Sequence, residues 1–158
     1  MPVATALGLA AALLERVRGA PWAARAWLLL IATTPLLFAG IKALVRRPRP
    51  ELWPRLLEHS GWAFPSGHAL FSATFFPLAA WTLARRFPRG APFLLGLGVL
   101  LPLYIGFGRL YLGVHWPSDV LAGWALGALQ GALAVAWLRR RGYPSRTGAS
   151  SSQAEPSA

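Results

Sequence analysis

The stretch PWAARAWLLLIATTPLLFAGIKALV, residues 21–45, is an apolar run in which only Arg25 and Lys42 carry a charge. A helix needs about 20 residues to cross the hydrocarbon core of a bilayer, so this run predicts a membrane-spanning helix. Three further apolar runs follow, separated by short arginine-bearing loops, over residues 68–84, 92–107 and 119–138. Two of them are short for a span but too apolar for exposed loops. We therefore predict an all-α integral membrane helix bundle with four long spans.

The composition of the chain is that of a membrane protein rather than a soluble domain. Charged residues make up 13% of the 158 residues, about half the usual share, and hydrophobic residues make up 55%. A further apolar run, residues 3–14, ends at Glu15 and Arg16 and lacks the basic start and cleavage site of a signal peptide. We expect a short N-terminal helix there that spans the membrane at a tilt, inserts partially, as we favour, or lies at the interface.

The end of the chain differs in composition from the rest. Residues 142–158, GYPSRTGASSSQAEPSA, are polar and rich in small residues, which predicts a disordered C-terminal tail. The membrane-embedded domain then covers residues 1–141. The chain has no cysteine, which excludes disulfides, thiolate zinc sites and a cysteine nucleophile.

The net charge of +11 does not indicate nucleic-acid binding, because the basic residues cap the ends of the apolar runs instead of forming one basic face. Membrane lipids with anionic head groups are the expected counter-charge. If each long run spans once, ten of the sixteen basic residues lie on one side: Arg16, Arg18, Arg25, Arg85, Arg86, Arg89, Arg139, Arg140, Arg141 and Arg146. The positive-inside rule makes that side cytoplasmic, together with the C-terminus. The loops over residues 46–67 and 106–118 then face the exterior or periplasm of a multi-pass inner (plasma) membrane protein.

The first external stretch is KALVRRPRP, residues 42–50. Its two prolines stop the helix from continuing, so Arg49 turns out of the helical path and can fold back toward Lys42. Lys42 is the only lysine among the sixteen basic residues, and a lysine supplies a compact point charge. We interpret Arg46 and Arg47 as side chains that snorkel at the helix end.

The second stretch is FPSGHA, residues 64–69. A turn over Pro65, Ser66 and Gly67 opens the next helix, whose start offers unpaired N–H groups that suit a phosphate. Ser66 is alternatively a helix N-cap with no further role. A protonated His68 is unfavourable in a first helical turn, and a bound anion would remove that conflict.

The third stretch is GRLYLGVHWPSD, residues 108–119. Asp119 alone is a favourable helix-start residue, and so is Pro117, two positions before it. His115 stands four positions before Asp119, a separation at which the carboxylate accepts a hydrogen bond from one imidazole nitrogen and leaves the other basic. That arrangement makes His115 a candidate nucleophile, and Arg109 is a candidate bidentate partner for a phosphate. His59, on the same side, is interpreted as an ordinary loop residue.

Together the three stretches resemble the motifs of the type 2 phosphatidic acid phosphatase family, the lipid-phosphatase branch of a superfamily that includes vanadium haloperoxidases. The family pattern is a lysine, six residues and Arg-Pro; then Pro-Ser-Gly-His; then Ser-Arg, five residues, His, three residues and Asp. Order and internal spacing agree, and the resemblance covers about residues 40–138. The matching positions are Lys42, Arg49, Pro50, Pro65, Ser66, Gly67, His68, Arg109, His115 and Asp119.

The resemblance implies a role for the matched residues. His115 would attack the phosphorus and form a phosphohistidine, Asp119 would orient His115, and His68 would protonate the leaving oxygen and then activate water. The phosphate oxygens would be held by Lys42, Arg49, Ser66, Gly67 and Arg109. The resemblance implies no metal ion and no other cofactor, and the sequence offers no convincing carboxylate cluster for a metal.

Two features depart from the family pattern. Gly108 replaces the serine before the arginine, which removes one hydroxyl near the phosphate, and we expect tuning of activity rather than its loss. Many family members have six spans, whereas this chain has four long runs and the short run over residues 3–14. The outer wall of the lipid groove and the oligomeric state are therefore left open.

The expected function is hydrolysis of a lipid phosphate or diphosphate at the outer face, with undecaprenyl diphosphate, phosphatidate and phosphatidylglycerophosphate as candidate substrates. An outward site favours the polyprenyl diphosphate, by analogy with carrier recycling. A lipid phosphotransferase that uses the same phosphohistidine is the alternative within this chemistry. A non-enzymatic protein that binds or transports anionic lipids is the alternative of another class, but it gives no reason for the spacing of His115 and Asp119.

Overall fold

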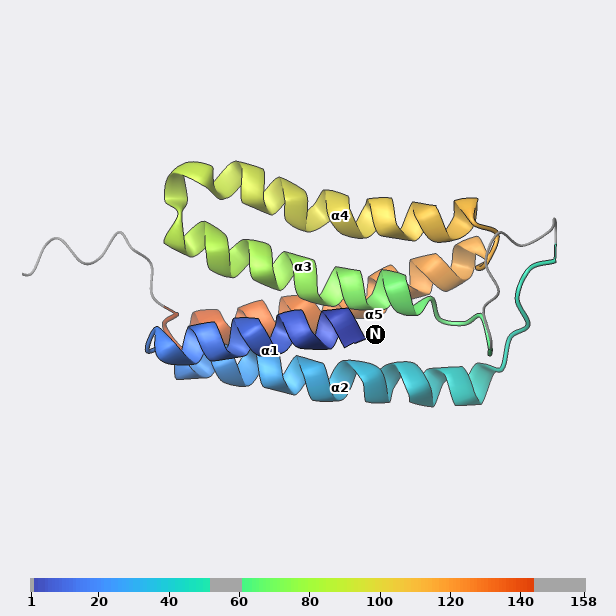
Figure 1. Ribbon diagram of the computed structural model, residues 1–158, viewed down its shortest axis with the longest axis horizontal. Helices are drawn as coiled ribbons and strands as arrows, with labels where there is room; N and C mark the ends of the chain where they lie inside the picture. Colours follow the sequence, from blue (N-terminus) through green and yellow to red (C-terminus); the bar gives the residue numbers. More distant parts are fainter. Residues whose placement is uncertain (1, 52–60, 144–158) are drawn as a thin grey trace, which may run out of the picture.

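The computed structural model describes residues 2–51 and 61–143, and the helices of this part of the chain lie lengthwise beside one another (Figure 1). They are α1 (Pro2–Val17), α2 (Pro21–Val45), α3 (Gly67–Arg86), the short 3₁₀ helix η1 (Pro88–Gly90), α4 (Ala91–Tyr111) and α5 (Pro117–Arg140). The predicted all-α helix bundle is confirmed. Each helix extends beyond the apolar run that predicted it, apart from α2, whose bounds coincide with the run.

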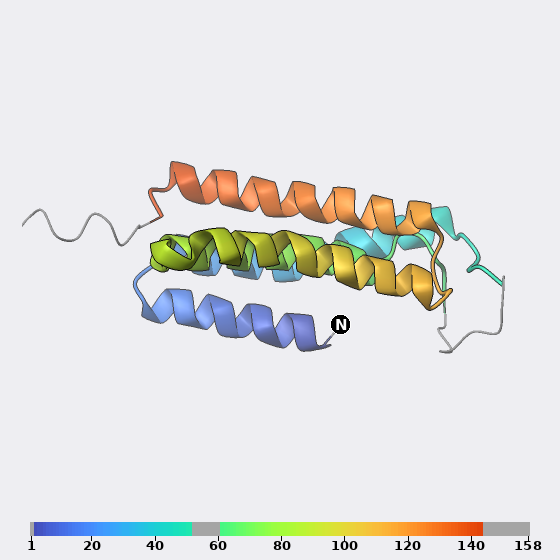
Figure 2. The same ribbon diagram turned by 90° about the horizontal axis from the view of Figure 1, so that it is seen from above.

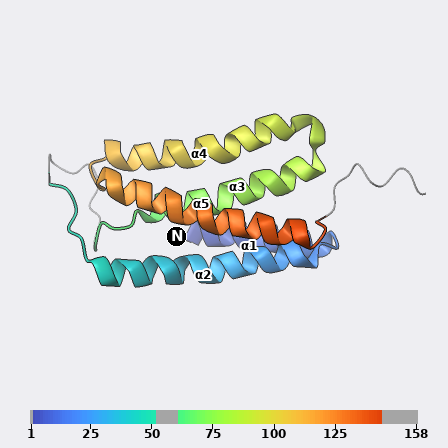
Figure 3. The ribbon, with the colours of Figure 1, turned by 180° about the vertical axis from the view of Figure 1, so that it is seen from behind.

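The helix α3 is the centre of the bundle. It packs against α4 and α5 along its length and also contacts α1 and α2. Figure 2 shows α5 and α1 on opposite sides of α3, and Figure 3 shows the face that α5 covers. More than half of the 20 residues of α3 are buried as a result.

The prediction of four long spans is not confirmed. Among the described residues, three helices are long and apolar enough to cross a membrane: Pro21–Val45, Pro88–Tyr111 and Pro117–Arg140. The remaining predicted span forms α3, which carries the buried hydroxyl groups of Ser72, Thr74 and Thr82. Each hydroxyl donates to a carbonyl one turn earlier in α3, so the helix satisfies these groups itself. A helix enclosed by its neighbours needs less apolar surface than one that faces lipid. Whether the 16-residue α1 spans or inserts partially stays a prediction.

The close approach of α3 and α5 depends on glycines of α5. A Cβ atom at Gly123 would lie 2.7 Å from the carbonyl oxygen of Ser66, and one at Gly127 would press on the carbonyl of Leu70. Small residues at such positions let two helix backbones touch inside a membrane. The Ser66 N–H consequently donates to the backbone oxygen of Asp119 at 2.9 Å, which holds the starts of α3 and α5 side by side.

The opposite end of the bundle is closed by a buried polar cluster. The carboxylate of Glu15 accepts hydrogen bonds from Arg86 Nη2 at 2.7 Å and from the Tyr143 hydroxyl at 3.0 Å. Glu15 and Tyr143 are each 5% exposed, so the chain remains packed two residues beyond the predicted domain boundary at 141. The rest of the predicted tail, residues 144–158, lies outside the described residues.

Candidate active site

The three motif-bearing stretches meet at one end of the bundle, at the right of Figure 1, where α2 and α4 end and α3 and α5 begin. The chain runs out of α2 into the segment that leads to α3, and out of α4 through a short turn into α5. Span parity predicted this meeting. His59 of the same region lies outside the described residues, so its interpretation as a loop residue stays a prediction.

His115 and Asp119 form the centre of the site. His115 lies in the turn before α5, and its Nδ1 is 3.5 Å from Asp119 Oδ2, at the outer limit of a hydrogen bond. The Nδ1 atom is buried and makes no hydrogen bond at this distance. Asp119 is 0% exposed, and its Oδ2 accepts the backbone N–H of Trp116 at 2.8 Å. The carboxylate therefore closes the first turn of α5 and faces the imidazole with the same oxygen.

Arg49 lies on the other side of the His115 ring. Its Nη1 donates to the carbonyl of Val114 at 2.7 Å and is 3.5 Å from Nε2 of His115, while its Nε donates to the carbonyl of Gly61 at 3.0 Å. The two ring nitrogens of His115 thus face a carboxylate and a guanidinium respectively. An anion that reached Nε2 would meet the guanidinium at once.

The surroundings of His115 keep its imidazole neutral. Burial lowers the pKa of His115 from its ordinary 6.5 to about 3, and the positive charges of Arg49 and Lys42 contribute in the same direction. Because the unprotonated ring has a free lone pair, this environment suits a nucleophile. Lys42 is half-buried in the last turn of α2, with its Nζ 4.6 Å from the centre of the Phe38 ring.

The start of α3 supplies the second motif. Ser66 occupies the N-cap position of α3, but its side chain makes no capping hydrogen bond. Its Oγ is buried without a hydrogen-bond partner, and its contact with a phosphate stays a prediction. Gly67 is the first residue of α3 and is buried, whereas His68 is exposed and contributes to the lowered pKa of His115.

Arg109 enters the site from the end of α4. It is half-buried in the last turn of α4, and its Nε is buried without a hydrogen-bond partner. Its backbone oxygen accepts the Val114 N–H at 3.3 Å, which places it at the base of the turn that carries His115. Its contact with a phosphate stays a prediction.

Arg47 is a member of this cluster that the sequence analysis missed. Its Nη1 donates to Asp119 Oδ1 at 3.0 Å and to Ser118 Oγ at 2.6 Å, so it does not simply snorkel at a helix end. One signal was available in the sequence. A residue before proline avoids the helical region, so Arg47, before Pro48, had to leave the helix axis.

An apolar groove of about 570 Å³ leads away from His68 along the face of α3 that α5 does not cover. Its walls come from α1, α2, α3 and α4. The lining residues include Leu7, Gly8 and Ala11 of α1, Trp27 of α2, Phe71 and Phe75 of α3, and Ile105 of α4. In Figure 1 this is the face of α3 that lies toward the viewer, between α4 and α1.

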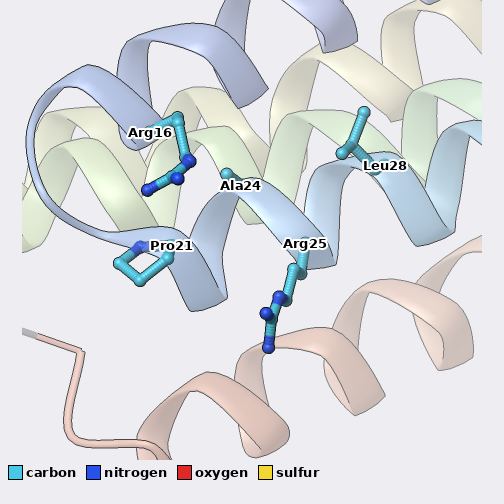
Figure 4. Close-up of a pocket in the computed structure, with 5 residues that line it drawn as sticks. All are labelled: Arg16, Pro21, Ala24, Arg25 and Leu28. Carbon is cyan, nitrogen blue, oxygen red and sulfur yellow. The ribbon is translucent and has the colours of Figure 1, made fainter.

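A second cavity, of about 340 Å³, lies at the opposite end of the bundle. It is lined by Arg16, Pro21, Ala24, Arg25 and Leu28, and Figure 4 shows the two guanidinium groups extending to different sides of α2. Two guanidinium groups on different sides of a helix do not form a cradle for one anion. Among the described residues, no group of three or more His, Cys, Asp or Glu could hold a metal ion. The expectation of a reaction without metal stays a prediction.

Comparison with known proteins identifies the family. The model of the PAP2 superfamily matches residues 23–143, a range that contains all three motifs, all of α3, α4 and α5, and α2 apart from its first two residues. This chain belongs to the PAP2 superfamily. The resemblance inferred from the three motifs is thereby confirmed.

Several relatives of this PAP2 chain carry names of lipid phosphatases. Phosphatidylglycerophosphatase B of Bacillus subtilis is 33% identical over 111 residues, which make up 68% of this chain and 54% of that protein. Undecaprenyl-diphosphatase of Sulfolobus acidocaldarius is 39% identical over 81 residues, 51% of this chain and 34% of that protein. The crystal structure of a transmembrane PAP2-type phosphatidylglycerolphosphate phosphatase from Bacillus subtilis matches with a TM-score of 0.75 at 28% identity. That match covers 88% of this chain and 75% of the other.

This PAP2 chain spans about half, or less, of the length of the curated relatives it matches. It also departs from the family motif at Gly108. A Cβ atom at this position would meet no other atom within 4 Å, so space does not explain the glycine. The structure offers no reason for it.

Proposed function

We propose that this PAP2 chain is a membrane lipid phosphatase in which His115 forms a phosphohistidine. The observation that carries the proposal is that each ring nitrogen of His115 faces a different charged group. Asp119 lies 3.5 Å from Nδ1, and Arg49 lies 3.5 Å from Nε2. A proton on Nδ1, facing the carboxylate, leaves the Nε2 lone pair directed to the side on which a phosphate meets Arg49.

In the first step, Nε2 of neutral His115 attacks the phosphorus and the bond from phosphorus to the lipid oxygen breaks. The electron pair of that bond stays on the lipid oxygen, which takes a proton from His68. The phosphorylated imidazole carries a positive charge, and the buried carboxylate of Asp119 stabilises it. General acid catalysis of this kind contributes about 10²- to 10⁴-fold to such a step.

In the second step, water attacks the phosphorus and passes its proton to His68. The electron pair of the nitrogen–phosphorus bond returns to His115, which becomes neutral again, and inorganic phosphate leaves. Lys42, Arg49, Arg109, Ser66 and the backbone N–H of Gly67 would hold the non-bridging oxygens throughout. Hydrogen-bond donors that are already positioned around the charged phosphate oxygens usually stabilise the transition state more than any other single factor.

The groove that begins at His68 supports a lipid as the substrate. A phosphate bound beside His115 would leave the attached chain next to Phe71 and Phe75, which line the groove. The substrates named for the relatives, phosphatidylglycerophosphate and undecaprenyl diphosphate, both join an anionic head to long apolar chains. We propose these two lipids and phosphatidate as the candidates.

The distribution of arginines supports an external site. The end of the bundle opposite to His115 carries the arginines that end α3, the arginine of η1 and those that end α5: Arg85, Arg86, Arg89, Arg139 and Arg140. By the positive-inside rule that end faces the cytoplasm. The site would then face the outside of the plasma membrane, or the periplasm.

Phosphate release by the purified protein in detergent, with a chelator present, tests the proposal. Each of the three lipids is assayed with wild type, with His115→Ala and with the control Arg46→Ala, whose side chain is exposed and bonds its own helix. We expect release by wild type and by the control, none by His115→Ala, and competitive inhibition by vanadate, which resembles the transition state.

Three outcomes would count against this function. Activity retained in His115→Ala would remove the nucleophile, and a requirement for an added metal ion would replace the mechanism. Labelled phosphate that appears on a second lipid, instead of in water, would assign the same phosphohistidine to a phosphotransferase.

A further inference from the structure

Arg47 occupies a position that is defined by several contacts. Arg46 ends α2 in a left-handed conformation, with φ 46°, and turns the chain out of the helix. The backbone oxygen of Arg47 then accepts the N–H of Ala63 at 2.8 Å, and the oxygen of Pro48 accepts Nε1–H of Trp116 at 3.1 Å. The Arg47 guanidinium packs over the Trp116 ring, 5.2 Å from its centre. The backbone bond to Ala63 and the Trp116 ring therefore fix the position of the Arg47 side chain.

The guanidinium of Arg47 is directed at the carboxylate of Asp119 and not at the imidazole of His115. Its Nη1 lies 3.0 Å from Asp119 Oδ1 and 2.6 Å from Ser118 Oγ. Oδ2, the other oxygen of this 0% exposed carboxylate, faces the Trp116 N–H and His115. Each oxygen of Asp119 thus has its own set of partners, and Arg47 is the partner on the far side from the nucleophile.

We propose that Arg47 is a positioning residue that acts through Asp119. The rotation of an aspartate carboxylate about its last bond is soft, so contacts to one oxygen are needed to direct the other. Arg47 holds Oδ1 and thereby keeps Oδ2 toward Nδ1 of His115. Arg47 also supplies a positive charge to the buried carboxylate. A bound phosphate would not compete for this charge, because the phosphate would meet Arg49, on the Nε2 side of His115. The proposal rests on the proposed function of His115 as the nucleophile.

The test compares the neighbouring arginines Arg46 and Arg47 in the complete chain. Arg47→Ala should lower kcat by about 10- to 100-fold, a loss typical of removing a residue that orients a functional side chain, while KM changes by less than about threefold. Inorganic phosphate should inhibit Arg47→Ala and wild type at similar concentrations. Arg46→Ala should keep wild-type kinetics, because its Nε bonds only the carbonyl of Ala43 within α2.

Two further measurements separate positioning from a general structural role. Guanidinium ion added to Arg47→Ala should restore part of kcat, and Arg47→Lys should retain more activity than the alanine variant. If Arg47 acts through Asp119, the double variant Arg47→Ala with Asp119→Asn should be no slower than Asp119→Asn alone.

Each contrary outcome has a defined meaning. A raised KM together with weaker inhibition by phosphate would make Arg47 a direct phosphate ligand. An unchanged kcat in Arg47→Ala, or fully additive losses in the double variant, would overturn the proposal while leaving the proposed function intact. Wild type that hydrolyses none of the lipids would count against the proposed function instead. Should Arg47→Ala fail to fold, Arg47→Lys and Arg47→Gln carry the same comparison.

Discussion

The guanidinium of Arg49 and the imidazole of His115 are fixed to the same turn, because Arg49 Nη1 donates to the carbonyl of Val114 at 2.7 Å and lies 3.5 Å from His115 Nε2. A cation held at this distance disfavours a proton on the ring and attracts an anion to it. In the proposed function, this one contact therefore serves both the neutral state of His115 and the binding of a phosphate.

The first prediction concerns stability and pH. The pKa of His115 is lowered by burial, and by Arg49 and Lys42, from 6.5 to about 3, and in the unfolded chain it returns to its ordinary value. Between these values the unfolded chain binds a proton that the folded protein does not. Stability is therefore complete above about pH 6.5 and falls as the pH drops toward 3, by up to a few kcal/mol. Melting in detergent should show a flatter pH dependence for His115→Gln than for wild type, and equal slopes would contradict the shifted pKa.

The helix bundle, and the meeting of the motifs at one end of it, were predictable from the lengths and the number of the apolar runs. Long apolar runs such as residues 21–45 indicate helices by length alone, and the number of runs decides which loops share an end. The four-residue separation of His115 and Asp119 brings the two side chains together where the turn before α5 enters the helix. Motif spacing and span parity therefore identified residues that the fold does bring to one place.

The remaining features depend on partners that are distant in the sequence. Arg46 and Arg47 look alike as neighbours, but the fold brings Asp119, 72 positions away, to Arg47 alone. The apolar run of α3 looked like a lipid-facing span, although the glycines of α5 let it become the enclosed centre of the bundle. Glu15 and Tyr143 are 128 positions apart, and no local pattern pairs them.

The groove beside α3 should determine how strongly the lipid chain contributes to binding. Leu7→Trp would narrow the groove, whereas Leu13→Trp is a matched control, since Leu13 lies on the same helix, is similarly exposed and does not line the groove. Losing contact with two methylene groups costs about 1.6 kcal/mol, so KM for a long-chain substrate should rise about tenfold. KM for a short-chain, soluble analogue should stay unchanged. An equal effect of the two variants would show that the chain lies elsewhere.

The polar cluster at the far end of the bundle should be a stability determinant. Glu15→Gln removes the negative charge that faces Arg86. Burial, together with Glu15, raises the pKa of Tyr143 to about 12, so its hydroxyl stays protonated and donates to Glu15. Breaking a fully buried pair costs about 3–5 kcal/mol. Because the Arg86 side chain is 24% exposed, we expect a smaller loss, about 2 kcal/mol, measured as a lower Tm in detergent. Tyr143→Phe should cost about 1 kcal/mol. A Glu15→Gln variant as stable as wild type would contradict the role of the cluster.

The orientation of the bundle can be measured directly because the chain has no cysteine of its own. Glu51→Cys places a thiol at the exposed site end, and Arg140→Cys places one at the exposed far end. The arginines that flank η1 and those that end α5 should hold the far end in the cytoplasm. A membrane-impermeant maleimide should therefore label Glu51→Cys in intact cells, and Arg140→Cys only after permeabilisation. The reverse pattern would place His115 on the cytoplasmic side, where a lipid made in the inner leaflet reaches it without crossing the membrane.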